Sequence, residues 1–158
     1  MELEIEKKII LKELPPIQYD NEIKITQYYF KNEDDQWERY RKSESDNGIE
    51  YFKTIKKTLR KGVSMEDESN ITQEEFKDKV KLCDRKISKT RYIKTTIDNL
   101  FWEVDVFDDI DMVMAEIEIP TEDYEVKYPK WIKGFIVEDV TGNKDFSNRR
   151  MAKEINYN

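Results

Sequence analysis

The chain has 158 residues, of which 40% are charged and 37% hydrophobic, and its formal net charge is -7 at pH 7. This acidic balance disfavours non-specific binding to duplex nucleic acid or to an anionic membrane. The sequence contains no histidine, which excludes His-based acid–base catalysis, Ser-His-Asp and Cys-His nucleophile systems, and His-rich zinc sites.

The remaining composition is that of a folded, single-domain protein spanning residues 1–158. An aromatic share of 12% argues against disorder, and 4 Gly and 4 Pro leave little material for a flexible linker. Cys83 is the only cysteine, so we expect no internal disulfide and a reducing, cytoplasmic location. No run approaches the roughly 18 apolar residues that a membrane span requires, and the N-terminus lacks the apolar stretch of a signal peptide.

In the first half of the chain, alternating polar and apolar residues predict strands. The expected strands cover residues 3–11, 23–31, 37–42 and 50–57, with a hairpin turn over 43–48 and breaks at 15–16 and 61–62. The pattern then changes to a helix over residues 72–82, with Thr72 as N-cap and Glu75 three residues later.

The second half again favours strands, because it is rich in β-branched and aromatic residues. Strands are expected over residues 86–97, 100–107, 112–119 and 137–141, one or two helical turns over 124–128, and a helix over 147–155. Seven or eight strands joined by short turns predict an α+β protein built on an antiparallel sheet or closed barrel with a few peripheral helices.

Like charges recur at every second residue inside these strands. The triplets are Glu4-Ile5-Glu6, Arg39-Tyr40-Arg41, Lys89-Thr90-Arg91, Glu103-Val104-Asp105 and Glu116-Ile117-Glu118. Side chains at i and i+2 of a strand share a face, so each triplet aims two like charges in one direction. A solvated outer face is the ordinary explanation. However, the triplets do not mix signs, and the alternate positions are strongly apolar, which favours an inner wall that binds ligands of opposite charge.

Such a wall suits a divalent cation together with a polyanion. Mg²⁺ and Mn²⁺ prefer oxygen ligands, typically carboxylates with water and substrate phosphate. Arg and Lys neutralise phosphate oxygens, and the sequence has no Gly-rich phosphate loop that could replace them.

The order of these motifs resembles the CYTH domain, also called the triphosphate tunnel metalloenzyme superfamily, across nearly the whole chain. The matching segments are Glu4-Ile5-Glu6-Lys7-Lys8, Thr26-Gln27-Tyr28-Tyr29, Arg39-Tyr40-Arg41, Thr54-Ile55-Lys56, Lys89-Thr90-Arg91-Tyr92, Trp102 to Phe107, Ala115-Glu116-Ile117-Glu118, and Asp139 to Asn148. The resemblance implies an eight-stranded antiparallel closed β-barrel that forms a tunnel with inward-pointing charges.

The resemblance also implies roles for individual residues. The carboxylates that would hold Mg²⁺ or Mn²⁺ are Glu4, Glu6, Glu116 and Glu118, with Glu118 favoured over Glu116. The residues that would bind the triphosphate are Lys8, Arg39, Arg41, Lys56, Lys89 and Arg91. Tyr29, with Lys8 or Lys89, is the candidate catalytic pair near the scissile phosphate. Glu66, Glu68, Glu103 and Asp105 would support a second metal or orient the basic residues.

Two positions depart from the family's usual pattern. Tyr28 stands where the family often has glycine, and Ser64 or Met65 stands where a phosphate-binding arginine commonly precedes the Glu-x-Glu pair. Lys61 or Arg60 could compensate for that arginine.

These features predict a metal-dependent triphosphatase, in which metal-activated water hydrolyses the terminal phosphate of inorganic tripolyphosphate or a nucleoside triphosphate. The alternatives are a thiamine triphosphatase, a class IV-type adenylyl cyclase, and a non-catalytic polyphosphate- or nucleotide-binding module. Stacking on a base or thiazolium ring would fall to Trp37, Tyr40 or Tyr128, unless these rings serve only in packing. The expected partner is a small-molecule triphosphate, with no membrane, and the chain is expected to be a monomer or homodimer.

Overall fold

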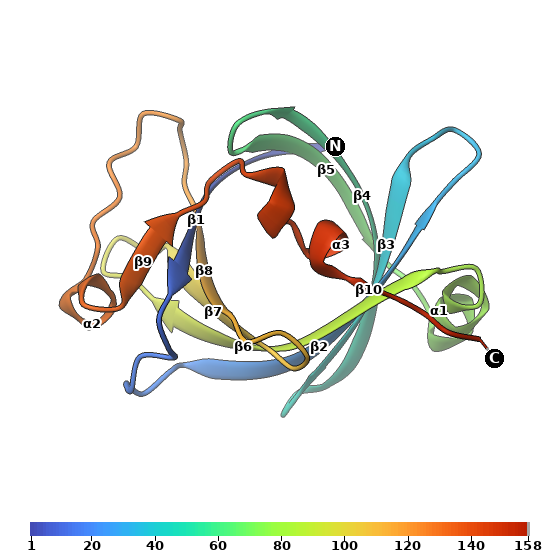
Figure 1. The fold of residues 1–158 in the computed structure, drawn as a ribbon, viewed down its shortest axis with the longest axis horizontal. Coiled ribbons are helices and arrows are strands. Elements are labelled where there is room, and N and C mark those ends of the chain that lie inside the picture. The colour runs from blue at the N-terminus through green and yellow to red at the C-terminus, as the bar shows by residue number, and fades with distance from the viewer. Residues whose placement is uncertain (158) are drawn as a thin grey trace.

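The computed structural model describes residues 1–157, and its main body is one antiparallel β-sheet closed into a barrel (Figure 1). The strands are β1 (Glu2–Leu11), β2 (Asn21–Lys31), β3 (Trp37–Ser45), β4 (Gly48–Arg60), β5 (Val63–Asn70), β6 (Arg85–Thr95), β7 (Phe101–Phe107), β8 (Val113–Glu118), β9 (Ile136–Asp139) and β10 (Lys153–Glu154). Within residues 1–157, eight strands form the ring in the order β6-β2-β3-β4-β5-β1-β8-β7, and β7 pairs again with β6. The predicted α+β closed barrel is therefore confirmed.

The strand register aligns the charged positions around the inside of the ring. Glu6 of β1 is opposite Glu118 of β8, and Arg91 of β6 is opposite Asp105 of β7. Because side chains alternate between the two faces of a strand, the second and fourth neighbours of each inward residue also point inward. The charge triplets thus face the interior from several strands at once.

The apolar positions between the charges form a core on the outside of β1, β7 and β8. Trp102, Val104, Ala115 and Ile117 are almost completely buried there. They are covered by the segment that follows β8, including the short helix α2 (Lys130–Lys133). Burying one such large side chain contributes about 1.5–3 kcal/mol relative to leaving it exposed. The covering segment therefore stabilises the strands β1, β7 and β8, whose other face carries charged residues of the interior.

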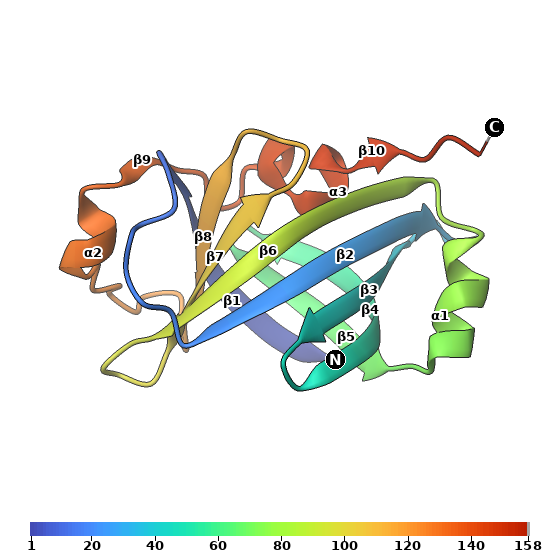
Figure 2. The same ribbon diagram turned by 90° about the horizontal axis from the view of Figure 1, so that it is seen from below.

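A second apolar cluster lies where the C-terminal segment meets the barrel. It includes Tyr29, Phe107 and Met114 of the barrel together with Phe146 and Ala152. The segment runs from β9 through the 3₁₀ turn η1 (Lys144–Phe146) and the helix α3 (Asn148–Met151) to β10. It crosses the opening of the barrel in Figure 1 and lies along one end of it in Figure 2.

The helix α1 (Gln73–Val80) begins as its sequence predicts. Thr72 accepts a hydrogen bond from the Glu75 backbone N–H, and the Glu75 side chain accepts one from the Thr72 backbone N–H, which completes a capping box. Its apolar face buries Phe76 beside Tyr28 and Tyr51 on the outside of the barrel.

Three expectations about elements were wrong or incomplete. The strand β5 was missed, because its run of Ser, Asp and Asn reads as a loop. The helical turns predicted over residues 124–128 are irregular chain, since Tyr124, Val126 and Tyr128 pack individually against the outer core. The helix predicted over 147–155 shortens to α3, because the residues after it pair with β6 as β10.

In the part of the chain that the structure describes, no helix is long and apolar enough to cross a membrane. Cys83 is a free, buried thiol just beyond α1. Burial, followed by the charges of Asp84 and Glu38, raises the pKa of this thiol to about 12, so it stays protonated and unreactive.

Candidate functional site

The barrel contains a partly open cavity of about 420 Å³. A volume of this size falls within the usual range for small-molecule sites, about 300–1,000 Å³. Nine residues that the sequence singled out line it together: Glu6, Lys8, Tyr29, Arg39, Arg41, Lys56, Lys89, Arg91 and Glu116. Two others, Glu4 and Glu118, are not among the lining residues.

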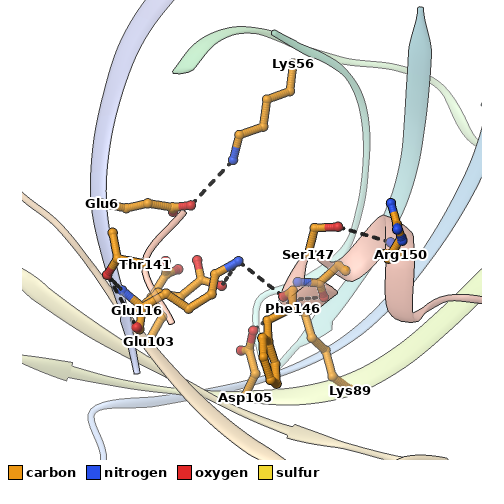
Figure 3. A network of polar contacts seen from close by, with 12 residues as sticks. Glu6, Lys56, Lys89, Glu103, Asp105, Glu116, Thr141, Phe146, Ser147 and Arg150 are labelled. Carbon is orange, nitrogen blue, oxygen red and sulfur yellow. Dashed lines mark hydrogen bonds and ion pairs between the residues drawn. The ribbon is translucent and has the colours of Figure 1, made fainter. Parts of the chain in front are cut away.

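Lys89 is held by two oxygen atoms although it is almost fully buried. Its Nζ lies 2.7 Å from Oδ2 of Asp105, which lies near it in Figure 3, and 2.8 Å from Asn148 Oδ1. Burial, followed by the positive charges of Arg91 and Arg41, lowers the pKa of Lys89 to about 8, while the carboxylate of Asp105 opposes the change. This ammonium group therefore sits close to its titration point at physiological pH.

Asp105 also fixes Arg91, the second basic residue of β6. Arg91 Nε lies 2.8 Å from Asp105 Oδ1 and Nη2 lies 3.0 Å from Oδ2, while Nη1 lies 2.9 Å from Glu103 Oε2. Burial of Asp105 is outweighed by Arg91 and Lys89, which hold the pKa of this carboxyl well below its usual range. Of the two roles expected for Glu103 and Asp105, these contacts match the orientation of basic residues.

A hydrogen-bonded chain connects Arg41, Gln27 and Tyr29. Gln27 Oε1 accepts from Arg41 Nε at 2.9 Å and from Nη2 at 2.7 Å, and Gln27 Nε2 donates to Tyr29 Oη at 2.7 Å. Since the phenol oxygen accepts this bond, its own proton is left to point elsewhere. Burial raises the pKa of Tyr29, so the phenol keeps that proton for donation. Sequence reasoning assigned no role to Gln27, which has an ordinary strand position.

Arg39 is oriented by β4 and β5. Its Nη2 donates to Thr54 Oγ1 at 3.1 Å and lies 3.4 Å from Glu68 and 3.7 Å from Glu66. Its buried Nε has no hydrogen-bond partner among the described residues. An unsatisfied buried donor on a cation that lines the cavity is a natural contact for an anionic ligand.

Carboxylates face each other in two pairs, Glu6–Glu116 in the lining of the cavity and Glu4–Glu66 next to it, and these four residues are called the acidic wall below. Burial, followed by the neighbouring Glu66, raises the pKa of Glu4 to about 8. Burial, followed by the charge of Glu116, raises the pKa of Glu6 to about 7, although Lys56 lies only 3.6 Å from it (Figure 3). Like charges this close cannot all ionise without a cation.

Glu116 and Glu118 have different surroundings on β8. Glu116 lies 3.7 Å from Lys8, and although burial opposes it, Lys8 and Lys89 lower the pKa of Glu116 to about 2. Glu118 is exposed, and burial followed by neighbouring acidic groups raises its pKa. Glu116 thus adjoins the basic wall, whereas Glu118 lies with the acidic residues at the rim.

The acidic wall fits a hard divalent ion in its donor chemistry. Mg²⁺ is commonly held by one or two carboxylates, with water and substrate phosphate as its other ligands. The paired carboxylates Glu4–Glu66 and Glu6–Glu116 offer such oxygens next to the basic cradle. Within residues 1–157 no group of three acidic or cysteine side chains is arranged to hold an ion by itself, so the substrate would complete the coordination.

The C-terminal segment supplies part of the cavity wall. The Lys8 backbone N–H donates to Thr141 Oγ1 at 2.9 Å, and Lys8 Nζ donates to the Phe146 carbonyl at 3.5 Å. Further lining residues from this segment include Lys144 and Arg149. Neither was predicted to bind substrate, because a pair of basic residues near a short helix has no distinctive spacing.

The two departures from the family pattern differ in whether they reach the cavity. Tyr28 points outward and packs its ring 5.8 Å from Phe76, so its bulk does not enter the site. Ser64 is buried and lines the cavity, while Arg60 forms an ion pair with Glu122 and is not among the lining residues. Arg60 therefore does not replace the arginine usual in the family.

Of the three aromatic residues considered for base stacking, one lies in the cavity. Tyr40 is buried in the cluster beside α1, and Tyr128 packs against Trp102 on the outer face. Trp37 lines the cavity, but its ring already has the cations of Arg149, Arg85 and Lys31 within 4.7, 5.7 and 5.9 Å of its centroid.

Comparison with known proteins gives matches in structure. No protein-family model and no curated protein matches the sequence. The crystal structure of the inorganic triphosphatase NE1496 shares 27% identity, covering 94% of this chain and 96% of its own, with a TM-score of 0.63. PH1819 from Pyrococcus horikoshii OT3 is 18% identical over 76% of this chain and 80% of its own, with a TM-score of 0.60.

A plant protein has the same fold at lower similarity. It is HpAC1 from Hippeastrum, a putative adenylyl cyclase described as having a dominant triphosphatase activity. It is 15% identical over 75% of this chain and 80% of its own, with a TM-score of 0.53.

Proposed function

We propose that this chain, a CYTH-type triphosphate tunnel protein, hydrolyses the terminal phosphoanhydride bond of a small-molecule triphosphate. The observation that carries this proposal is one cavity lined both by the six basic residues of the expected phosphate cradle and by the carboxylate pair Glu6–Glu116. The inorganic triphosphatase NE1496, with the same fold and 27% identity, supports the same reaction class.

The basic wall is suited to bind the triphosphate. Arg39, Arg41 and Arg91 each have part of the guanidinium group fixed by protein oxygens, so their orientation is set before substrate arrives. Preorganised donors stabilise developing negative charge at little reorganisation cost, which is a main source of catalysis in phosphoryl transfer.

The acidic wall would hold Mg²⁺ or Mn²⁺ through Glu4, Glu6, Glu66 and Glu116, with Glu118 at the rim. When bound, the ion would offset phosphate charge as a Lewis acid.

Lys89 and Tyr29 are the proposed catalytic residues. In the reaction, a water oxygen attacks the terminal phosphorus, the bridging P–O bond breaks, and the leaving phosphate oxygen gains negative charge. Lys89, whose pKa is about 8, is positioned to neutralise or protonate such an oxygen. Tyr29 can donate the proton that its bond from Gln27 leaves available.

Inorganic tripolyphosphate is the favoured substrate. Of the three aromatic residues considered for base stacking, Trp37 alone lines the cavity, and three cations already contact its ring. A nucleobase or thiazolium ring would have to displace them. Phosphate groups alone need no such platform.

The test is a phosphate-release panel with tripolyphosphate, ATP and thiamine triphosphate, each with Mg²⁺ or Mn²⁺. We expect turnover that depends on the metal and is fastest for tripolyphosphate. Lys89→Ala should reduce turnover strongly. Lys86→Ala is its matched control, because Lys86 is on the outer face of the same strand, above the Tyr28 ring.

Two results would contradict the proposal. Tight binding of tripolyphosphate without any hydrolysis would instead identify a binding module. Equal losses in Lys89→Ala and Lys86→Ala would remove Lys89 from the reaction.

A further inference from the structure

Arg149 is a cation in the cavity that the triphosphate cradle does not require. It is the second residue of α3, and its guanidinium carbon lies 4.7 Å from the centroid of the Trp37 ring. Both residues line the cavity. The Arg149 carbonyl also accepts a hydrogen bond of 3.4 Å from Arg85 Nη1, which ties this turn of the chain to β6. The ring and the backbone contact together hold the guanidinium at the cavity edge.

No carboxylate in residues 1–157 pairs with Arg149. The groups whose charges act on it are Arg85 and Arg150, of like charge, and the phenol of Tyr29. Burial, followed by Arg85 and Arg150, lowers the pKa of Arg149. By contrast, the neighbouring Arg150 has an ion pair with Asp145 at 3.8 Å. A half-buried cation without a counter-charge is costly, and an anionic ligand would remove that cost.

Lys144 extends this positive region along the same segment. It lines the cavity, and no acidic side chain among the described residues lies within ion-pairing distance of it. Lys144 and Arg149 thus face the cavity from the C-terminal segment, while the cradle residues Arg39, Arg41, Lys56, Lys89 and Arg91 belong to barrel strands.

We propose that Arg149 and Lys144 form an additional anion subsite that takes the fourth phosphate of a linear polyphosphate. This inference rests on the proposed function, in which the cradle holds three phosphates beside Tyr29. Because Tyr29 and Arg149 line the same cavity and Arg149 belongs to α3, the subsite extends from the candidate reaction centre toward the C-terminal segment. The substrate class therefore includes linear polyphosphates longer than three phosphates.

A linear polyphosphate fits this surface better than a nucleotide does. The Trp37 ring, which could otherwise stack on a base, is in contact with Arg149, Arg85 and Lys31. A fourth phosphate would meet cations, whereas an uncharged ribose and base would leave them unpaired. Guanidinium groups bind phosphate through charge-assisted and often bidentate hydrogen bonds.

The test compares tripolyphosphate with linear tetrapolyphosphate in steady-state hydrolysis. Arg149→Gln should raise the KM for tetrapolyphosphate about tenfold, since about 1.4 kcal/mol of binding corresponds to a factor of ten. The KM for tripolyphosphate should change far less. Arg149→Lys should restore part of the tetrapolyphosphate affinity. Arg150→Gln is the matched control, because the Arg150 side chain is largely exposed and pairs with Asp145.

Equal effects of Arg149→Gln on both substrates, or no effect on either, would overturn the subsite. Calorimetric binding of both polyphosphates without metal gives a readout independent of catalysis. Tripolyphosphate hydrolysis without any Arg149-dependent preference would leave the proposed function standing and remove the subsite. If the protein hydrolyses neither compound but binds tetrapolyphosphate more tightly in a way that depends on Arg149, the subsite stands and the proposed function fails.

Discussion

At the scale of single residues, Asp105 controls two cations at once. It contacts Lys89 and Arg91 while having no measurable exposure to solvent. Its negative charge raises the pKa of Lys89 against the effect of burial. Asp105 is therefore a positioning residue, which acts on the substrate through its two partners.

Replacing this charge should move the pH dependence of catalysis. The kcat/KM profile reports free-enzyme groups, so its basic limb should lie near the pKa of Lys89, about 8. In Asp105→Asn that limb should move down by about 1 to 3 pH units, because an adjacent opposite charge changes a pKa by that amount. The measurement is kcat/KM for tripolyphosphate from pH 6 to 10.

Two further variants keep this prediction testable if Asp105→Asn is unstable. Lys89→Arg should abolish the basic limb, since an arginine stays charged throughout that range. Asp108→Asn, which removes a surface partner of Lys24 just beyond β7, should leave the profile unchanged. An unshifted limb in both Asp105→Asn and Lys89→Arg would assign the titration to another group.

Replacing the Glu6 carboxylate tests whether the acidic wall binds the metal ion. Glu6→Gln should lower metal-dependent turnover at least about a hundredfold, because even outer partners of metal ligands cost about 10–100-fold. The fold should persist, since the change removes a charge beside Glu116. Turnover and the apparent metal affinity are measured together, with exposed Glu22→Gln as the control. Unchanged metal affinity would remove Glu6 from the ion site.

The sequence predicts the charged residues of the site better than the neutral ones. Alternating like charges are visible because two of them on one face are costly, as at Arg39 and Arg41. Gln27 gives no such signal, although it joins Arg41 to Tyr29. Arg149 gives none either, because its position depends on how the C-terminal segment folds over the barrel.

At the scale of elements, a change in the N-cap of α1 should affect the stability of the protein but not its activity. Thr72→Ala removes the hydrogen bond to the Glu75 N–H and should lower the free energy of unfolding by about 1 kcal/mol. Turnover at 25 °C should not change, because α1 packs outside the barrel. Chemical denaturation measures the first effect and phosphate release the second. Thr72→Ser, which keeps the cap, should have neither effect.

The elements that were predicted correctly have strong local signals, and the others depend on tertiary contacts. β1 and α1 follow from alternation and from the capping box. β5 has few apolar residues and forms because β4 and β1 pair with it on both sides. The segment over residues 124–128 has a helix-like start, but burial of its aromatic side chains on the outer core outweighs that propensity.

At the scale of the whole molecule, the acidic wall should make stability depend on pH when metal is absent. Glu4 and Glu6 have pKa values raised from 4.5 to about 8 and about 7. From pH 4.5, the ordinary pKa, up to these raised values, the folded state holds more protons than the unfolded state. The free energy of unfolding therefore falls as the pH rises through this range. In the presence of EDTA, the melting temperature should decrease from pH 5 to pH 8, the range in which Glu4 and Glu6 lose their protons in the folded state.

Divalent ions should reverse this trend by binding the ionised carboxylates. Adding Mg²⁺ or Mn²⁺ should raise the melting temperature more at pH 9 than at pH 5, because more of the carboxylates are ionised at pH 9. A ligand that binds only the folded state stabilises that state by mass action. The double variant Glu4→Gln/Glu6→Gln should show a flatter pH dependence and a smaller metal effect. A metal effect that is equal at both pH values would contradict this assignment.

The pairing of the first strand with the last part of the chain bears on how the protein reaches its folded state. The bond from the Lys8 N–H to Thr141 Oγ1 joins residues 133 positions apart, and β1 also pairs with β8 and β9. During synthesis, the part of β1 from Glu6 to Leu11 must therefore wait for most of the chain before its partner strands β8 and β9 exist. Contacts of such long range favour slow folding, and an unpaired strand edge in that interval invites association between chains. The charged side chains of β1 oppose such association because burying them between two chains would cost free energy, so residues that line the ligand site also disfavour aggregation.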